Sequence, residues 1–514
     1  MDVEISKILS DFNKLKWSVA YKGILAGVAA GLLVSFYRLG MEFGIEKSLQ
    51  AYAFLKLHPG YIIPWVLIIA AVGYVLYYLM RLEPYAKGSG IPQVEGIVML
   101  GMKMKWHTIL LVRFLAGFLS SFFGLSLGRE GPSIQIGAAG SHGLAKKISG
   151  NILEENCLIT AGASAGLSAA FNAPLSGAMF ALEEVHRTFS PNILLAAITA
   201  ALTADVVSKC FFGLTPVLDY GDIVQLPIWS YAWLLPLGVL CGVVGAITNK
   251  GLLKFGILYE KLPPALRPMV ALLIALPCGL LIPQVPGGGQ NLILLSEKAQ
   301  AGISMLVILL AVKLLFTCTS FGSGIPGGIF MPILSIGALT GSIVGQTLVS
   351  YGLPQACIPA CCVCAMAGVM SGSVKAPITS ILLMAEMTGS LIHLLPVAAV
   401  AFIALLTSDL LKISPIYEVL LERLSGESEE SLHIKESGTM IEISVELGSK
   451  VDGKKVKEVN WPEGVLIVGL SRGKKEVVPN GDTQIMHGDY LVALSSQQEF
   501  EQMHRALMDL CHMG

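Results

Sequence analysis

The chain has 514 residues, of which 54% are hydrophobic and 14% are charged. Soluble domains carry roughly 25% charged residues, so this composition is typical of a protein embedded in a lipid bilayer. The formal net charge of -1 provides no basic surface for nucleic acid, which we exclude as a partner. The charges are uneven, because residues 427–514 hold 24 of the 71 Lys, Arg, Asp and Glu residues. We therefore predict a membrane domain followed by a polar tail.

Apolar segments that approach the ~20 residues needed to cross a bilayer recur along the chain. They lie near 20–40, 61–81, 108–127, 191–213, 228–250, 265–283 and 303–320, and further segments near 330–350, 357–373 and 377–411 are interrupted by Gly and Pro. The first run follows lysines at positions 7, 14, 16 and 22, which predicts an uncleaved span with a cytoplasmic N-terminus. Irregular backbone at membrane depth is tolerated only where protein or a water-filled cavity covers it, so the interrupted segments indicate a binding site.

The membrane part contains an internal repeat. The segment 128–138 recurs 200 residues later as 328–338, with five of eleven positions identical. Three further matches have nearly the same offset: Ala173-Pro174 with Ala376-Pro377, Glu183 with Glu386, and Gly88 with Gly288. We infer an all-α polytopic membrane domain, residues 1–424, built from two inverted-topology repeats of about 20–215 and 228–424 with broken helices. Glu183 and Glu386 occur in both halves, so we interpret them as structural.

The ten cysteines fall mostly in apolar stretches, and their one cluster is Cys357, Cys361, Cys362 and Cys364. Metal ligation is one interpretation, but small residues of this kind also pack membrane helices, and we favour packing. We predict neither a metal site nor a cofactor.

The polar tail begins with a linker, residues 425–438, and continues as a small cytosolic α+β domain, residues 439–514. Strands are predicted at 440–446, 464–470 and 489–494, and a helix at 498–510.

Three glycine motifs point to anion binding: Gly88-Ser89-Gly90-Ile91-Pro92, Gly128-Arg129-Glu130-Gly131-Pro132 and Gly327-Gly328-Ile329-Phe330-Met331-Pro332. A Gly-rich turn that feeds a helix presents unpaired backbone N–H groups and the positive end of the helix dipole, which attract an anion without a full positive charge. Such binding is weak enough to permit release. The alternative for any single motif is close helix packing. Gly322–Gly327 matches a dinucleotide-binding spacing, but no soluble strand, helix and strand unit surrounds it.

The order and spacing of the three motifs resemble the CLC family of chloride channels and proton-coupled chloride transporters, over about residues 15–424. The resemblance implies a homodimer in the bilayer with one pathway per subunit. It implies that the hydroxyl groups of Ser89 and Tyr417 and the N–H groups of Ile329 and Phe330 coordinate the central chloride. Family members that favour nitrate tend to carry proline at the serine position, so Ser89 points to chloride. The transported ions would be chloride and protons.

Glu130 is the predicted gate, because an ionisable group at membrane depth is costly and usually functional. An ionised Glu130 would occupy an anion position, and a protonated one would leave it, so that proton and anion compete for one site. The alternative is that Glu130 pairs with Arg129 or caps a helix, and Arg129 itself is interpreted as structural or field-shaping.

Glu184 distinguishes two mechanisms. It aligns with the family's internal proton-transfer glutamate, which exchangers typically have and channels typically lack, so its presence favours exchange. The alternative is an ordinary carboxylate at a helix end near His186 and Arg187. Glu95 and Lys375 are interpreted as internal pairing groups.

The tail resembles the C-terminal subdomain of RCK-type regulatory domains through 453–459, 462–468 and 488–492. Such modules often dimerise and some bind small ligands, so a small-molecule ligand and a purely structural role both stay open. The resulting prediction is a proton-coupled chloride exchanger in a prokaryotic inner membrane, with both termini cytoplasmic. Its rivals are a passive chloride channel, an intramembrane enzyme, for which no H-E-x-x-H or nucleophile elbow is present, and a membrane sensor.

Overall fold

The computed structural model describes residues 2–149, 152–187, 191–218, 220–221, 223–425, 438–446, 448–462, 465–472, 475–496 and 500–511. It divides into two compact units, Met1–Leu421 and Glu422–Gly514, which are described separately.

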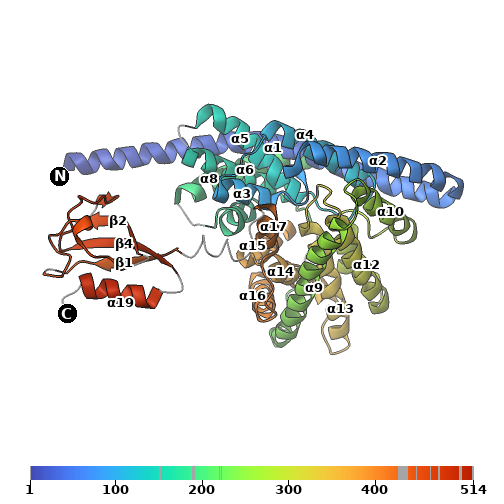
Figure 1. Ribbon diagram of the computed structural model, residues 1–514. Coiled ribbons are helices and arrows are strands. Elements are labelled where there is room, and N and C mark those ends of the chain that lie inside the picture. The colour runs from blue at the N-terminus through green and yellow to red at the C-terminus, as the bar shows by residue number, and fades with distance from the viewer. Residues whose placement is uncertain are drawn as a thin grey trace. The chain divides into compact units, whose positions relative to one another are not determined.

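The first unit is helical throughout (Figure 1). Its first half contains α1 (Asp2–Leu57), α2 (Ile62–Leu82), α3 (Ile91–Leu100), α4 (Trp106–Phe122), α5 (Glu130–Ile148), α6 (Ile152–Phe171), α7 (Pro174–Phe180) and α8 (Pro191–Phe212). Its second half contains α9 (Leu234–Glu260), α10 (Leu266–Leu281), α11 (Gln290–Glu297), α12 (Ile303–Gly322), α13 (Phe330–Val349), α14 (Ile358–Val374), α15 (Pro377–Thr388) and α16 (Leu394–Leu410), followed by α17 (Ile416–Ser425). Seven helices of the described residues are long and apolar enough to span a bilayer. The predicted polytopic all-α fold is confirmed.

The two halves repeat one packing pattern. In the first half α5 packs on α6 and α1 on α8, and in the second half α13 packs on α14 and α9 on α16. Backbone bonds cross between the halves, since the Gly88 N–H donates to the Gly324 carbonyl at 3.0 Å and the Gly287 N–H donates to the Gly124 carbonyl at 3.1 Å. The structural counterpart of Gly88 is therefore Gly287, one residue before the glycine that the sequence offset selects.

Glu183 and Glu386 join the halves by capping each other's repeat. Glu386, on α15, accepts the N–H groups of Leu175 and Ser176 at 2.9 and 2.8 Å, at the start of α7. Glu183 follows α7 and accepts the N–H groups of Ile378 and Thr379 at 3.2 and 2.8 Å, at the start of α15. A carboxylate satisfies the unpaired N–H groups of a helix start and is favoured by the helix dipole. This arrangement confirms the structural interpretation of both glutamates.

The clustered cysteines lie at the start of α14 and along its buried face, where all four side chains are at most 3% exposed. Among the described residues no group of three or more His, Cys, Asp and Glu side chains could hold a metal ion. Lys375 pairs with Asp409 at 2.5 Å, which confirms its interpretation as a pairing group.

The second unit is an α+β domain with a four-stranded sheet in the order β1-β4-β2-β3 and a helix, α19 (Figure 1). Its elements are β1 (Gly438–Ser444), β2 (Leu466–Arg472), β3 (Lys475–Val477), β4 (Asp489–Ser496) and α19 (Phe500–Cys511). The three predicted strands and the helix are confirmed, and β3 was not predicted. Asp489 is buried and accepts two bonds from Arg472 at 2.7 Å. Burial raises the pKa of the Cys511 thiol to about 11, so this cysteine stays protonated within the core. The predicted linker lies almost entirely outside the described residues.

The reciprocal caps predict a specific loss of stability. Replacing Glu386 with Ala removes the acceptor for two backbone N–H groups and the Ser176 hydroxyl, and a lost cap costs about 2 kcal/mol. We expect Glu386→Ala to lower the thermal unfolding midpoint of the detergent-purified protein. Glu46→Ala is the control, because Glu46 accepts only a bond from Gln50 of its own helix. Equal midpoints for the two variants would contradict the capping role.

Candidate functional site

The two related glycine motifs meet at the centre of the membrane unit. Gly128 and Gly328 form an antiparallel bridge in which each N–H donates to the other's carbonyl at 2.7 Å. Two residues beyond the bridge, α5 begins at Glu130 and α13 begins at Phe330. Two helix N-termini from sequence segments 200 residues apart therefore open at one place. Unpaired N–H groups and the positive ends of both helix dipoles make this place attractive to an anion.

The Glu130 carboxylate occupies this place. The residue is 0% exposed, and its carboxylate is near the backbone N–H groups of Arg129 and Met331. A Cβ atom on Gly328 would be 2.7 Å from Oε2 of Glu130, so only glycine leaves room for the carboxylate there. Neither carboxylate oxygen pairs with a side chain of the described residues. The carboxylate thus lies beside backbone donors that an anion could also use, and it has no hydrogen bond of good geometry to any described residue.

Ser89 and Tyr417 bring two hydroxyl groups to the same region. Their side chains lie close together, Ser89 is 2% exposed and Tyr417 is 0% exposed. Neither hydroxyl has a hydrogen-bond partner with good geometry among the described residues. Buried hydroxyl groups without a protein partner are rare, and an anion or a water molecule can satisfy them. A Cβ on Gly131 would be 2.5 Å from the Ser89 hydroxyl, which places Ser89 directly behind the residue that follows Glu130.

Ile329 and Phe330 complete the predicted anion set from the second half. Both residues are 0% exposed. The Phe330 ring contacts the Tyr417 ring, with centroids 6.1 Å apart, and the Phe180 ring, with centroids 5.5 Å apart. The fold therefore gathers Ser89, Phe330 and Tyr417 from three distant segments.

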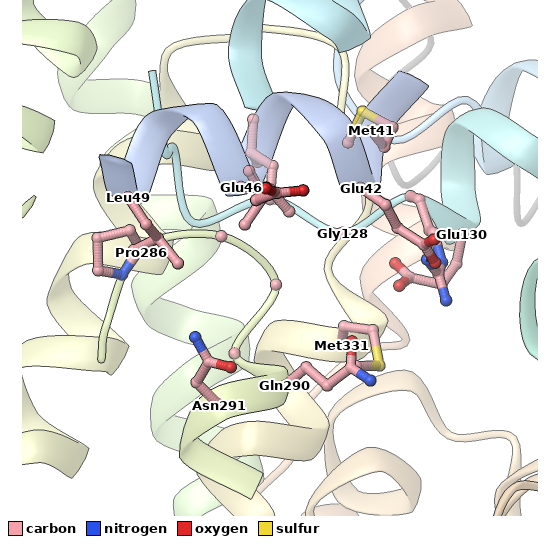
Figure 2. A pocket seen from close by; sticks show the side chains of 16 residues that line it. Met41, Glu42, Glu46, Leu49, Gly128, Glu130, Pro286, Gln290, Asn291 and Met331 are labelled. Atoms are coloured by element: carbon pink, nitrogen blue, oxygen red, sulfur yellow. The ribbon is translucent and has the colours of Figure 1, made fainter. Parts of the chain in front are cut away.

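A cavity of about 270 Å³ leads to Glu130 from one side. Its wall is formed by α1, the start of α5 and the loop before α11, and the residues along it include Glu42, Glu46, Arg129, Gly287 and Gln290. Figure 2 shows Glu42 of α1 and Glu130 of α5 reaching the same corner of this cavity, with Glu46 further along α1. The cavity therefore borders the residue that carries the buried carboxylate.

Arg129 does not pair with Glu130. Its Nη1 atom is 2.5 Å from Oε1 of Glu42, and the same oxygen is 3.0 Å from Nε of Arg38. Arg129 is the N-terminal flanking residue of α5, and α5 has no side-chain cap.

Glu184 lies in a π-helical turn, Ala181–Val185, that extends α7. Such turns are rare and often occur at functional sites. The side chain is 5% exposed, and its Oε2 atom has no hydrogen-bond partner among the described residues. The nearby Arg187 forms ion pairs with Glu95 at 2.8 Å and with Glu418 at 3.3 Å. The predicted pairing role of Glu95 is confirmed.

Two buried cations were missed by the sequence analysis. Arg113 on α4 is 0% exposed and donates to the Gly88 carbonyl at 2.7 Å, and Lys313 on α12 is 0% exposed and donates to the Gly287 carbonyl at 2.7 Å. They are 200 residues apart, so they are repeat counterparts that support the two glycine turns. The signal was present, since each is the only charge in an apolar run, and intramembrane charges are usually functional.

The fold and this geometry define a polytopic membrane transport protein in which broken helices from the two halves meet at a buried carboxylate. The chain matches the family described as Voltage gated chloride channel over residues 66–409, and it belongs to that family, the CLC channels and transporters. The tail matches the TrkA-C domain over residues 440–508, which confirms the RCK-type prediction.

Similar proteins cover nearly all of the membrane unit. An H(+)/Cl(-) exchange transporter, ClcA, from Salmonella arizonae is 31% identical over 431 residues, 81% of this chain and 89% of that protein. A slow cyanobacterial Cl-/H+ antiporter has a similar structure, with a TM-score of 0.74, 28% identity, and coverage of 80% of this chain and 99% of that one. A CLC-type fluoride/proton antiporter gives a TM-score of 0.64 at 26% identity, with coverage of 78% and 96%.

The unpartnered hydroxyl groups predict a loss of chloride affinity on their removal. Tyr417→Phe keeps the ring that contacts Phe330 but removes a hydrogen bond to an anion, which is worth about 1.5 kcal/mol or roughly tenfold in affinity. We expect isothermal titration of the purified protein with chloride to show about tenfold weaker binding. Tyr220→Phe is the matched control, because the Tyr220 hydroxyl is also buried but contacts the Met366 sulfur. An unchanged affinity in Tyr417→Phe would place the anion elsewhere.

Proposed function

We propose that this chain is a secondary active transporter that exchanges chloride for protons across a bacterial inner membrane. The observation that carries the proposal is the position of the Glu130 carboxylate, which is fully buried, has no side-chain partner, and lies where the N-termini of α5 and α13 meet. One set of backbone donors can serve either this carboxylate or a chloride ion. The Salmonella and cyanobacterial relatives, described as Cl(-)/H(+) exchangers, support the same activity.

The coupling follows from competition for these donors. When Glu130 is ionised, its carboxylate occupies the helix N-termini and excludes chloride. When Glu130 takes up a proton, its attraction to the N–H groups falls, so the side chain leaves and chloride enters. Chloride next meets the hydroxyl groups of Ser89 and Tyr417 and the Phe330 ring. Uptake of a proton by Glu130 therefore opens the site to chloride, and release of the proton closes it again.

Glu184 would deliver protons on the opposite side. It is buried and retains an unpartnered oxygen, as a group that takes up and releases a proton requires. A passive chloride channel on the same fold is the second candidate, and the presence of this buried carboxylate favours exchange over it.

The lysines and the length of α1 indicate which side of the membrane the cavity near Glu130 faces. With Lys22 at the cytoplasmic side, Glu42 lies 20 residues further along α1, which is about 30 Å at 1.5 Å per residue. That distance is the thickness of the hydrocarbon core, so the cavity that leads to Glu130 would open to the outside. Both termini would be cytoplasmic. A homodimer and a small-molecule ligand of the TrkA-C tail are part of the same proposal, by family resemblance.

The test is a flux measurement in proteoliposomes. With an outward chloride gradient and no proton gradient, we expect chloride efflux to drive protons inward against an opposing membrane potential. Chloride movement with a reversal potential that ignores pH would contradict exchange and support the channel.

Two variants test the assigned glutamates in the same assay. Glu130→Ala removes the group that competes with chloride, so chloride should still move while proton movement is lost. Glu184→Ala should also abolish proton movement and leave chloride transport in place. Intact coupling in either variant would refute the role assigned to that residue, even where the wild-type protein exchanges as proposed.

A further inference from the structure

Each of the two proton-carrying glutamates has an arginine close to it in sequence. Arg129 directly precedes Glu130, and Arg187 follows Glu184 by three residues. An arginine beside a buried carboxylate normally forms a charge-assisted pair that strongly favours the ionised form. A glutamate held in this way would resist protonation and would be a poor proton carrier.

In the structure, the first arginine is occupied by another carboxylate. Arg129 is bound to Glu42 of α1, at 2.5 Å, and Glu42 also accepts a bond from Arg38 at 3.0 Å. Arg38 is fixed in turn, because its Nη1 donates to Asn172 at 2.9 Å and its guanidinium lies over the Phe212 ring, 3.8 Å from the centroid. Glu42 is thus linked through Arg38 to the end of α6 and to α8, and it pairs with the Arg129 guanidinium, which forms no hydrogen bond with Glu130.

The second arginine is occupied in the same way. Nη2 of Arg187 is 2.8 Å from Glu95 on α3, and Nη1 is 3.3 Å from Glu418 on α17. Arg187 has a φ of +53°, in the left-handed region that side chains other than glycine rarely adopt. A conformation of this kind persists only where the surroundings determine it, and two carboxylates on separate helices supply that constraint. Glu184 Oε2 is left without a partner.

We propose that Glu42 and Glu418 are positioning residues that withhold Arg129 and Arg187 from Glu130 and Glu184, so that both glutamates can bind and release protons. This inference deepens the proposed exchange and rests on it. Neither Glu42 nor Glu418 is one of the residues assigned to bind the anion, and each acts through its arginine. At both ends of the proposed pathway, the arginine near the glutamate is paired with a different carboxylate, although the two segments differ in sequence and local structure.

Other charged and titratable groups lie near Glu130 and Glu184, and the substitutions used in the tests leave these groups unchanged. Around Glu130 they are Tyr37 on α1, Arg113 on α4 and Tyr417 on α17, with Glu46 on the cavity wall. Around Glu184 they are Glu95, Glu183 and Tyr417. None of them is altered by changing Glu42 or Glu418 to Gln.

The first test is the pH dependence of chloride transport in Glu42→Gln. The change releases Arg129 to pair with ionised Glu130, so a higher proton concentration is needed to free the gate. With equal pH on both sides of the vesicles, which makes protein orientation irrelevant, we expect the pH of half-maximal chloride flux to fall by about one unit. A pH profile that is unchanged or shifted upward would overturn the proposal.

Glu46→Gln is the matched control for that test. Glu46 lies one turn further along α1 on the same cavity wall, and among the described residues it accepts a bond from Gln50 and pairs with no arginine. Its loss removes the same charge from the cavity without releasing an arginine, so its profile should follow the wild type. An equal shift in Glu42→Gln and Glu46→Gln would show a general effect of cavity charge and would also overturn the proposal. The double variant Glu42→Gln with Arg129→Gln should cancel the shift, because no arginine is then available.

The second test uses the other end of the pathway and does not depend on the folding of the Glu42 variant. Glu418→Gln releases Nη1 of Arg187 toward Glu184, so we expect the ratio of protons to chloride to fall at least twofold while chloride flux is retained. Glu418→Asp keeps the carboxylate and should restore coupling. Glu155→Gln is the control, because Glu155 has a similar exposure of 26% and pairs with His142 at 2.8 Å. A wild-type ratio in Glu418→Gln would overturn the inference for this end.

The outcomes separate this inference from the proposed function. If the wild-type protein moves chloride without protons, exchange is refuted, and the symmetric-pH profile of Glu42→Gln still decides whether Glu42 withholds Arg129 from the gate. If the wild type exchanges but the pH profile and the coupling ratio ignore Glu42 and Glu418, exchange stands and the positioning roles are refuted.

Discussion

The reciprocal backbone bridge between Gly128 and Gly328 is the contact on which the rest of the membrane unit depends. Backbone groups at membrane depth must find partners within the protein, and here two broken segments satisfy each other. The bridge fixes the starts of α5 and α13 side by side, and it leaves their first N–H groups free for an anion or a carboxylate. Because both bridge residues are glycines, the Glu130 side chain fits between them.

Several carboxylates of the membrane unit fall into three groups. Glu183 and Glu386 cap helices of the opposite repeat and bind the halves together. Glu42 and Glu95 neutralise arginines. Glu130 differs from both groups, because it lies beside backbone N–H groups and neither of its carboxylate oxygens has a hydrogen-bond partner of good geometry among the described residues. In a low-dielectric interior an unpaired carboxylate is costly, so sites that are left unpaired are those where a change of protonation state has a use.

The tail is a separate unit with its own core. The buried Asp489, bound by Arg472 at 2.7 Å, fixes the start of β4 beside β2, and apolar residues of the sheet pack on α19. This core contains none of the residues Ser89, Glu130, Ile329, Phe330 and Tyr417. Its match to the TrkA-C domain extends over residues 440–508.

The sequence by itself determined the class of the protein, the repeat and most of the long apolar helices, because hydropathy and glycine motifs are local patterns, and it singled out Ser89 and Glu130 as candidates by their motifs and Glu184 by family resemblance. It also placed the strands of the tail, except for β3, which has only three residues. Only the tertiary structure decided which carboxylate meets which arginine. The partners of Arg129 and Arg187 are 87 and 231 residues away, at Glu42 and Glu418, and no local pattern relates charges at such separations. Contacts of this kind depend on how helices pack, so the surroundings of Glu130 and Glu184 could be read only from the folded chain.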